Sequence, residues 1–265
     1  MPQDLSFPPR RRIAVVGGGI SGMGAAYQLS RTHDVTLFEA EGRLGGHART
    51  IMAGKRGDQP VDTGFLVFNY ANYPRMAELF AELDVPVVKS NMSFGASIDG
   101  GRIEYGLASL SALFAQKRNA ANPKFLRMVR DIFHFNANAL RIANEDRSRT
   151  TAQFLEVLGT GSWFRDYYLL PLSGAIWSTP TQKIMDFPAH AMIQFFENHA
   201  LLSHTGQHQW WTVDGGSVEY VRRLEAAMLG NRVDIRLGAP VQQVLRGGFG
   251  VRIKAWGGAY EDFDE

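Results

Sequence analysis

RIAVVGGGISGMGAAYQLSRTHDVTLFE, residues 12–39, is the stretch of this sequence that decides the fold. It opens with a short β-branched run at 13–16 and then passes through three consecutive glycines. A small-residue segment with the composition of a helix follows, and a second apolar run at 34–39 predicts another strand. A strand, a glycine turn, a helix and a second strand form a βαβ unit. We therefore expect a parallel sheet that begins with these two strands.

The glycines of this unit have the spacing of a dinucleotide-binding turn. Gly17, Gly19 and Gly22 form the pattern Gly-x-Gly-x-x-Gly. The first glycine permits the tight turn, the second lets the backbone approach a diphosphate, and the third lets the helix pack closely on the strand. Ile20 and Ser21 open the helix, whose free N–H groups and positive dipole end would face the phosphates. A glycine turn that binds nothing is the alternative.

An acidic residue and a second glycine pair follow this turn. Glu39 ends the second strand 22 residues after Gly17, close to the spacing of about 20 expected for an acid that binds a ribose hydroxyl pair. A carboxylate there repels a 2′-phosphate, which disfavours NADP. Gly45 and Gly46 come next, where an NAD dehydrogenase would run directly into another helix. This pair favours a different dinucleotide.

At this point the sequence resembles the flavin-containing amine oxidase superfamily, which includes monoamine and polyamine oxidases, protoporphyrinogen oxidase and phytoene desaturase. Members carry a glycine pair after an acid and an arginine, as in EAEGRLGGHART at 39–50. VDTGF at 61–65 and APV at 239–241 resemble two further family segments, so the resemblance covers roughly 12–70 and 209–262. The segments 170–178 and 209–217 are similar to a bacterial branch of predicted NAD/FAD-binding proteins.

The resemblance implies that FAD is the cofactor. It places the diphosphate on the glycine turn, the adenosine ribose on Glu39, the phosphates and ribityl chain along 43–47, the flavin beside 62–64 and the adenine at Val241. The residues expected to bind FAD are Gly17, Gly19, Ile20, Ser21, Gly22, Glu39, Arg43, Gly45, Gly46, His47, Asp62, Thr63, Gly64 and Val241.

The sequence departs from the family pattern in three places. Many members have an arginine directly after the glycine pair, where this chain has His47, so the charge there is titratable. Many also have an arginine two residues after the ribose acid, where this chain has Glu41. The family's C-terminal glycine-acid motif for the ribityl chain is missing before residue 265, so we expect a fragment or truncated product that holds FAD incompletely.

The expected fold class is α/β with two domains. A Rossmann-like FAD-binding domain, with a parallel sheet plus a β-hairpin, would comprise 1–72 and 209–265, and a mainly helical substrate domain would comprise 73–208. Apolar spacing predicts helices at 73–80, 107–116, 123–143, 151–158 and 218–229, a strand at 233–237, and a hairpin of 241–245 with 251–256.

Composition excludes several classes of protein. The chain has 28 Lys plus Arg, 26 Asp plus Glu and no Cys. A net charge of +2 gives little attraction to nucleic acid, so we expect no nucleic-acid partner. Without cysteine there are no disulfides, Cys-ligated zinc sites or thiol nucleophiles, which fits a reducing, cytoplasmic location. The longest apolar run, 167–177, is far below the roughly 20 residues of a membrane span.

Three further features have two interpretations each. His199, His204 and His208 are interpreted as loop or interface residues rather than metal ligands, since no Asp, Glu or Cys accompanies them at ligand spacing, and no metal is expected. Trp177, Trp210 and Trp211 could line an apolar substrate pocket or belong to the core. The basic helix faces at 117–118, 127, 130 and 141 are interpreted as solvated surface, with peripheral contact to an anionic membrane as the alternative.

The expected function is FAD-dependent oxidoreduction. A small-molecule or lipid-like substrate, apolar or amine-containing, would lose a hydride from a C–N or C–C bond, and an external acceptor would reoxidise the flavin. The sequence has no Gly-x-Ser-x-Gly elbow and no second Gly-x-Gly-x-x-Gly after a strand, so no catalytic residue is assigned. The alternatives are a non-catalytic truncated flavoprotein remnant and an NAD-dependent dehydrogenase.

Overall fold

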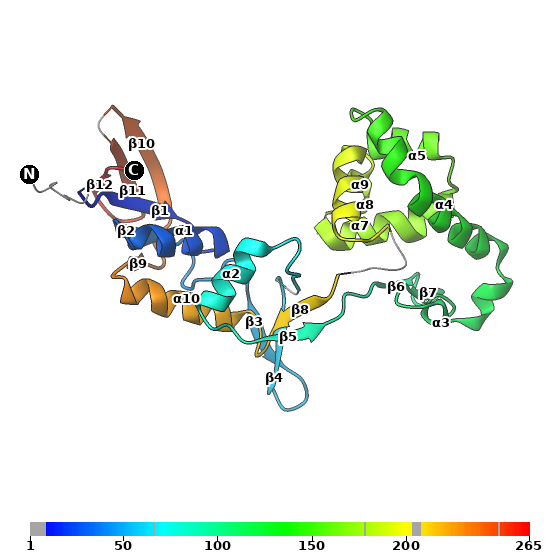
Figure 1. The fold of residues 1–265 in the computed structure, drawn as a ribbon, viewed down its shortest axis with the longest axis horizontal. Helices are drawn as coiled ribbons and strands as arrows, with labels where there is room; N and C mark the ends of the chain where they lie inside the picture. Colours follow the sequence, from blue (N-terminus) through cyan, green and yellow to red (C-terminus); the bar gives the residue numbers. More distant parts are fainter. Residues whose placement is uncertain (1–8, 66, 178, 203–207, 249) are drawn as a thin grey trace, which may run out of the picture. The chain divides into compact units, whose positions relative to one another are not determined.

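The chain forms two compact units in a computed structural model that describes residues 9–65, 67–177, 179–202, 208–248 and 250–265 (Figure 1). The first unit comprises Met1–Ser90 and Trp210–Glu265, and the second comprises Asn91–Gln209. The chain leaves the first unit through β5 (Val87–Ser90) and returns through β8 (Trp210–Val213), and these strands pair antiparallel. This pairing keeps 73–90 in the first unit, whereas the sequence suggested a boundary at 72.

The predicted βαβ unit is present and opens the first unit. It consists of β1 (Arg12–Val16), α1 (Ile20–Ser30) and β2 (Asp34–Phe38). The two strands are parallel in the register Ile13↔Val35, and β9 (Asp234–Arg236) continues the sheet in the order β1-β2-β9, again parallel. The α/β class with a parallel sheet is therefore confirmed.

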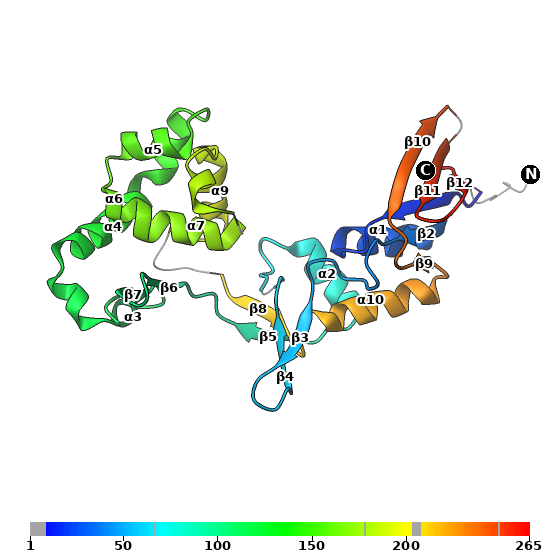
Figure 2. The same cartoon turned by 180° about the vertical axis from the view of Figure 1, so that it is seen from behind.

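The helices of the first unit pack against this sheet and each other. Figures 1 and 2 both show α1 beside α10 (Val218–Gly230). Met23 of α1, Leu37 of β2, and Leu224 and Met228 of α10 are fully buried in one core. The predicted helix at 73–80 is α2 (Pro74–Glu82), whose Phe80 joins the same core. Apolar contact with this core explains why α2 belongs to the first unit.

A small antiparallel sheet completes the first unit. The predicted hairpin is β10 (Val241–Gly247) with β11 (Gly250–Ala255), and β12 (Tyr260–Phe263), which the sequence did not predict, pairs with β11. Phe263 packs edge-on against Phe38 at 6.0 Å between ring centres. Hydrogen bonds from the Ala14 amide to the Glu265 carbonyl and from the Asp264 amide to the Arg12 carbonyl join this end of the chain to β1.

Two more short pairs lie in the described part of the chain. β3 (Thr50–Ala53) pairs antiparallel with β4 (Gln59–Asp62) in the first unit. β6 (Gly95–Ile98) pairs antiparallel with β7 (Ile103–Gly106) in the second unit, which the sequence predicted to be mainly helical.

The predicted helix at 107–116 is wrong in its length. Only α3 (Leu110–Leu113) forms there, followed by the 3₁₀ helix η1 (Lys117–Ala121). The reason is local, because β7 extends to Gly106 and the Ser109 hydroxyl caps the short helix by accepting from the Ala112 amide.

The other predicted helices of the second unit are confirmed. The long helix is α4 (Pro123–Glu145). Asn122 precedes it, and the Asn122 side chain accepts from amides of the first turn. α5 (Thr151–Leu158) follows it. The remaining elements are α6 (Ser162–Phe164), the π-helical turn η2 (Arg165–Leu169), α7 (Leu170–Trp177), α8 (Thr181–Ile184) and α9 (Ala189–Asn198). Their core is aromatic, built around Phe135, Phe154, Phe164 and Phe196, all fully buried.

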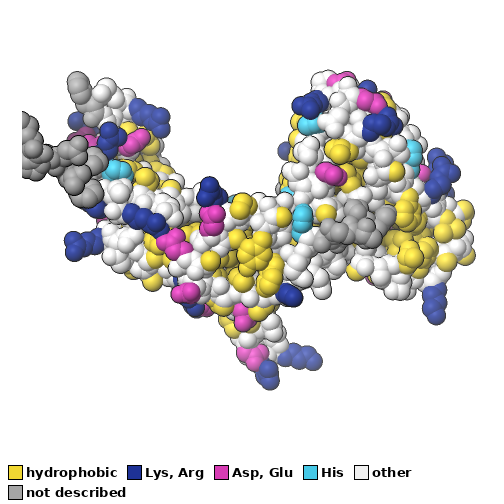
Figure 3. Space-filling model, in the orientation of Figure 1, with side chains coloured by type: hydrophobic (Ala, Val, Ile, Leu, Met, Phe, Trp, Pro, Cys, Tyr) yellow, Lys and Arg dark blue, Asp and Glu magenta, His cyan; other side chains and the backbone are white. Residues whose placement is uncertain are grey.

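Charges are mixed over the surface. On the face drawn in Figure 3, Lys and Arg side chains are interspersed with Asp and Glu on both units. On α4, Arg141 pairs with Glu145, as expected for a solvated helix face. Among the described residues, no helix is both long enough and apolar enough to span a membrane.

Candidate functional site

The glycine turn after β1 leaves an open hollow. Gly17 has φ of +103°, a conformation that favours glycine, and a methyl carbon at Gly22 would lie 1.8 Å from the Gly17 carbonyl oxygen. Gly22 is therefore required for the close packing of helix on turn. At Gly17 and Gly19 the position of a side chain has no atom within 4 Å. Their backbone therefore borders free space that a ligand can occupy.

The amino end of α1 lies at this hollow. Gly19 caps the helix in an extended conformation without a side-chain hydrogen bond, and its first turn contains no acidic residue. Ile20 and Ser21 begin the helix at this point. The positive end of the helix dipole is not neutralised by a neighbouring carboxylate of that turn, which makes it suitable for an anion.

Glu39 connects the turn to the loop that follows β2. Its side chain is nearly buried, and its Oε2 accepts from the Gly18 amide at 2.5 Å while its Oε1 accepts from the Glu41 amide at 2.7 Å. These two bonds fix the plane of the carboxylate beside the hollow. Each oxygen can accept one more hydrogen bond, because a carboxylate oxygen has two acceptor sites.

The second glycine pair lies directly against the first turn. The Gly45 amide donates to the Gly18 carbonyl at 2.8 Å, and Gly19 and Gly45 form a β-bridge. Both Gly45 and Gly46 have positive φ, and a methyl carbon at Gly46 would lie 3.0 Å from the Gly19 Cα. Only glycine fits this close approach of two backbones, so the two glycine motifs form one structure.

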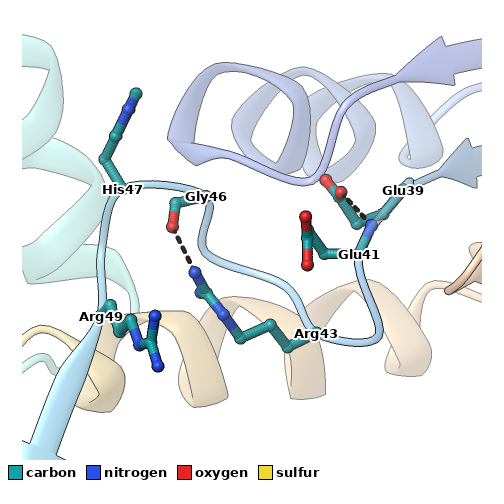
Figure 4. A pocket seen from close by; sticks show the side chains of 6 residues that line it. All are labelled: Glu39, Glu41, Arg43, Gly46, His47 and Arg49. Carbon is teal, nitrogen blue, oxygen red and sulfur yellow. Dashed lines mark hydrogen bonds between the residues drawn. The ribbon is translucent and has the colours of Figure 1, made fainter. Parts of the chain in front are cut away.

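Arg43 holds this loop together. Its guanidinium donates to the carbonyls of Gly46 at 2.9 Å, Leu44 at 3.2 Å and Ala48 at 3.4 Å (Figure 4). Within the described residues it has no carboxylate partner within 4 Å, so its positive charge stays uncompensated. The sequence predicted Arg43 as a cofactor ligand, whereas the hydrogen bonds in the structure join its guanidinium to the carbonyls of its own loop.

A cavity of about 440 Å³ opens beside the loop. The residues that line it are Glu39, Glu41, Arg43, Gly46, His47 and Arg49. Figure 4 shows the side chains of Arg43 and Arg49 converging on one side of the loop, with His47 pointing away from them. Glu41 and Arg49 were not among the predicted ligands. Their signal in the sequence was their place on either side of the second glycine pair.

Asp62, Thr63 and Gly64 lie next to this loop. The Asp62 Oδ1 accepts from the Ser217 amide at 2.9 Å, the Ser217 hydroxyl at 2.7 Å and the Thr50 hydroxyl at 2.5 Å, so it caps the amino end of α10. The Thr63 amide donates to the Arg49 carbonyl at 2.9 Å. A methyl carbon at Gly64 would lie 1.9 Å from the His47 carbonyl oxygen. The segment 62–64 therefore packs against the loop at His47 and Arg49 and supports it.

The segment before β10 lies beside Glu39. The Ala239 amide donates to the Glu39 carbonyl at 2.8 Å, and the Gly238 amide donates to the Glu41 carbonyl at 2.9 Å. Val241 is partly buried and packs against the small core that contains Phe38. The structure thus brings Val241 to the same end of the sheet as Glu39, although 202 residues separate them in the sequence.

The three tryptophans of interest belong to different units. Trp210 and Trp211 lie on β8 in the first unit, where Trp211 exchanges backbone hydrogen bonds with Phe68. Trp177 lies in the second unit, where it lines an apolar cavity of about 300 Å³. The other lining residues of this cavity are Phe187, Pro188, Ala191, Met192 and Phe195.

One histidine of the 199–208 segment stacks on an aromatic ring. The His199 ring stacks on Phe195 with 3.9 Å between ring centres. His204 lies outside the described residues. In the part of the chain that is described, no group of three His, Cys, Asp or Glu side chains is placed to hold a metal ion.

Comparison with known proteins gives one consistent result. The family model for flavin containing amine oxidoreductase matches residues 20–265. Over 43 residues the chain is 58% identical to protoporphyrinogen oxidase 2 of Arabidopsis thaliana, covering 16% of this chain and 8% of that protein. Over 77 residues it is 44% identical to coproporphyrinogen III oxidase of Mycobacterium bovis, covering 28% of this chain and 16% of that protein.

Solved structures share the fold. The chain aligns with cyclohexylamine oxidase from Brevibacterium oxydans with a TM-score of 0.69 and 18% identity, covering 97% of this chain and 57% of that one. It aligns with a putrescine oxidase bound to putrescine with a TM-score of 0.65 and 20% identity, with the same two coverages. The chain thus spans little more than half the length of these structures and a much smaller part of the curated relatives.

Proposed function

This chain belongs to the flavin containing amine oxidoreductase family, and from that premise we propose that residues 17–49 hold the ADP half of FAD for an oxidation of a small organic molecule. FAD is the cofactor of the family. The observation that carries the proposal is the open backbone at Gly17 and Gly19 beside a cavity lined by Glu39.

The residues present fit this cofactor. The hollow at the glycine turn would be filled by side chains if either glycine were replaced, and it lies at the uncapped amino end of α1. A diphosphate carries the negative charge that this helix end attracts. Glu39 keeps free acceptor sites for the two hydroxyls of a ribose. Val241 provides an apolar contact for the adenine at the same end of the sheet.

Each part of the site has a separate task. When bound, the flavin supplies the electron sink that takes a hydride from a C–N or C–C bond and passes the electrons to an external acceptor. Gly17, Gly19 and Gly22 let the backbone amides approach the diphosphate. Gly45 and Gly46 keep the loop close to the turn. Asp62, through its cap on α10, positions the 62–64 segment that we place at the flavin's edge.

The substrate is proposed at the level of its chemical class. The two relatives given above are named for porphyrinogens, and the two solved structures for amines. The apolar cavity at Trp177 would take an apolar part of such a molecule.

We propose the cytoplasm as the location of the protein, because a sequence without cysteine fits a reducing compartment.

The visible spectrum of the purified chain tests the proposal. A yellow preparation, or one that becomes yellow with added FAD and is bleached by an amine or porphyrinogen, supports the oxidoreductase. A yellow preparation that no such substrate bleaches indicates a flavoprotein remnant without turnover. A colourless chain that binds NAD and not FAD contradicts the proposal.

Glu39→Ala is the sharpest test of the site itself. We expect FAD to bind at least about tenfold more weakly, because the variant loses the acceptor for two ribose hydroxyls. Fluorescence titration with FAD measures the change, and Glu39→Gln serves if the alanine variant unfolds. Glu156→Ala removes an exposed carboxylate of α5 in the second unit and is the matched control. Equal affinity of Glu39→Ala and Glu156→Ala would contradict the assigned role.

A further inference from the structure

The cavity of about 300 Å³ in the second unit has aromatic walls. Trp177 is the last residue of α7, Phe187 precedes α9 and Phe195 belongs to α9. Figures 1 and 2 both show α7 next to α9. The Phe187 ring is inclined by 74° to the Trp177 ring, and the Phe195 ring is inclined by 56°. Rings that meet at such steep angles enclose a box, whereas a flat ligand needs two parallel walls. The cavity therefore fits a compact group.

Contacts behind the rings hold this box in place. Trp177 stacks on the fully buried Phe196 with 5.9 Å between ring centres. The Phe187 carbonyl accepts from the Thr151 amide at 2.8 Å and from the Thr151 hydroxyl at 3.1 Å, which fixes the backbone that carries this ring. A ligand therefore finds walls that are already ordered, so binding does not cost the entropy of ordering them.

The side chains that line the box offer little to a charged or polar ligand. Among the described residues that line it, none carries a charge or a side-chain oxygen. The Met192 sulfur, a weak acceptor, already accepts from the Ser173 hydroxyl at 3.6 Å and from the Thr151 hydroxyl at 4.0 Å. An ammonium group that entered would lose its water, and only the faces of the rings would compensate for that loss. The cavity therefore favours a neutral group.

We propose that this cavity binds a compact, branched and neutral hydrocarbon group of a small organic molecule. That this molecule is the substrate of the oxidation rests on the proposed function. Removing such a group from water against apolar walls is favourable in proportion to the area that is buried. Flat ring systems, straight chains and ammonium groups fit the same box less well.

Three small alcohols test the proposal by titration of the whole purified chain, followed through tryptophan fluorescence because Trp177 is part of the wall. Neohexyl alcohol ends in a tert-butyl group, choline has the same shape with a positive charge, and n-hexanol is the straight-chain isomer of neohexyl alcohol. We expect neohexyl alcohol to bind at least about threefold more tightly than either, because choline loses its hydration and n-hexanol loses bond rotations. Equal or tighter binding of choline or n-hexanol would overturn the proposal.

Ala191→Leu locates the binding in the cavity. Ala191 lines the cavity from α9 and is exposed, so a leucine there takes up part of the space while the helix keeps a favourable residue. We expect neohexyl alcohol to bind at least about tenfold more weakly to this variant. Ala137→Leu adds the same side chain at an exposed position of α4 and is the matched control. Equal affinities of the two variants would overturn the proposal, and far-ultraviolet circular dichroism verifies that both are folded.

The titrations use no FAD, so their outcome does not depend on the proposed function. A chain that binds FAD but not neohexyl alcohol would overturn the assignment of this cavity and leave the FAD site intact. A chain that binds neohexyl alcohol but not FAD would instead contradict the proposed function and support the assignment of the cavity.

Discussion

At the scale of the residue, two glycines of the same helix differ in the space that the structure leaves for a side chain. Gly22 faces the Gly17 carbonyl with no room for a side chain, whereas Gly24, two residues later in α1, has no atom within 4 Å of the place that a side-chain carbon would take. The first is required by close packing and the second is an ordinary helical position. Substitution distinguishes them.

Gly22→Ala should destabilise the first unit by about 3 kcal/mol or more, because the added methyl overlaps a backbone oxygen that can move only with the turn. Gly24→Ala should stabilise it by up to about 1 kcal/mol, since alanine is favoured over glycine within a helix. Urea denaturation of both variants measures the two effects. Similar changes of the same sign would show that the turn does not have the described geometry.

At the scale of the element, side-chain caps give a physical reason for where two of the predicted helices begin. Thr150 precedes α5, and its hydroxyl accepts from the Gln153 amide while the Gln153 side chain accepts from the Thr150 amide. Gly159, with φ of +73°, follows the last residue of the helix. α10 is capped by Asp62, a residue from a distant part of the sequence. The α5 capping residues are neighbours in the sequence, whereas the residue that caps α10 is found only in the structure.

Thr150→Ala should lower the free energy of unfolding of the second unit by about 1 kcal/mol, because one helix-end amide loses its acceptor. Chemical denaturation followed by circular dichroism measures the loss. Combining it with Gln153→Ala should add little, since the two side chains act as one capping box. A double variant whose loss equals the sum of the two single losses would contradict this pairing.

At the scale of the whole molecule, two separate cores contain buried tyrosines that can ionise only at a cost. Burial and the Asp62 carboxylate raise the pKa of the Tyr220 hydroxyl to about 12 in the first unit. Burial also raises the pKa of Tyr105 and Tyr168 in the second unit. Both units should therefore lose stability in alkaline solution.

The direction in which stability changes with pH follows from the difference between the pKa of Tyr220 in the folded chain and its pKa in the unfolded chain. Below pH 10, the ordinary pKa of tyrosine, the hydroxyl is neutral in both states and stability is fully present. As the pH rises toward 12 the unfolded chain ionises first, so stability falls, by up to about 2 kcal/mol for Tyr220. Urea denaturation over this range should show a shallower fall in Tyr220→Phe. An identical fall in that variant would contradict the burial of Tyr220.

The sequence by itself determined the parallel βαβ opening, the glycine turn with its acid, most of the long helices and the family. These features depend on neighbours within about 40 residues, where spacing and glycine chemistry act directly. Only the tertiary structure decided that Asp62 caps α10, that Arg43 is held by its own loop while Arg49 faces the cavity, and that α2 and β5 belong with the first unit. The outcomes for Asp62 and β5 depend on the contacts of Asp62 with Ser217 and of β5 with β8, which join residues more than 100 positions apart and leave no periodic signal in the chain. The carbonyls that hold Arg43 lie within five residues of it, in an irregular loop that has no periodic pattern either.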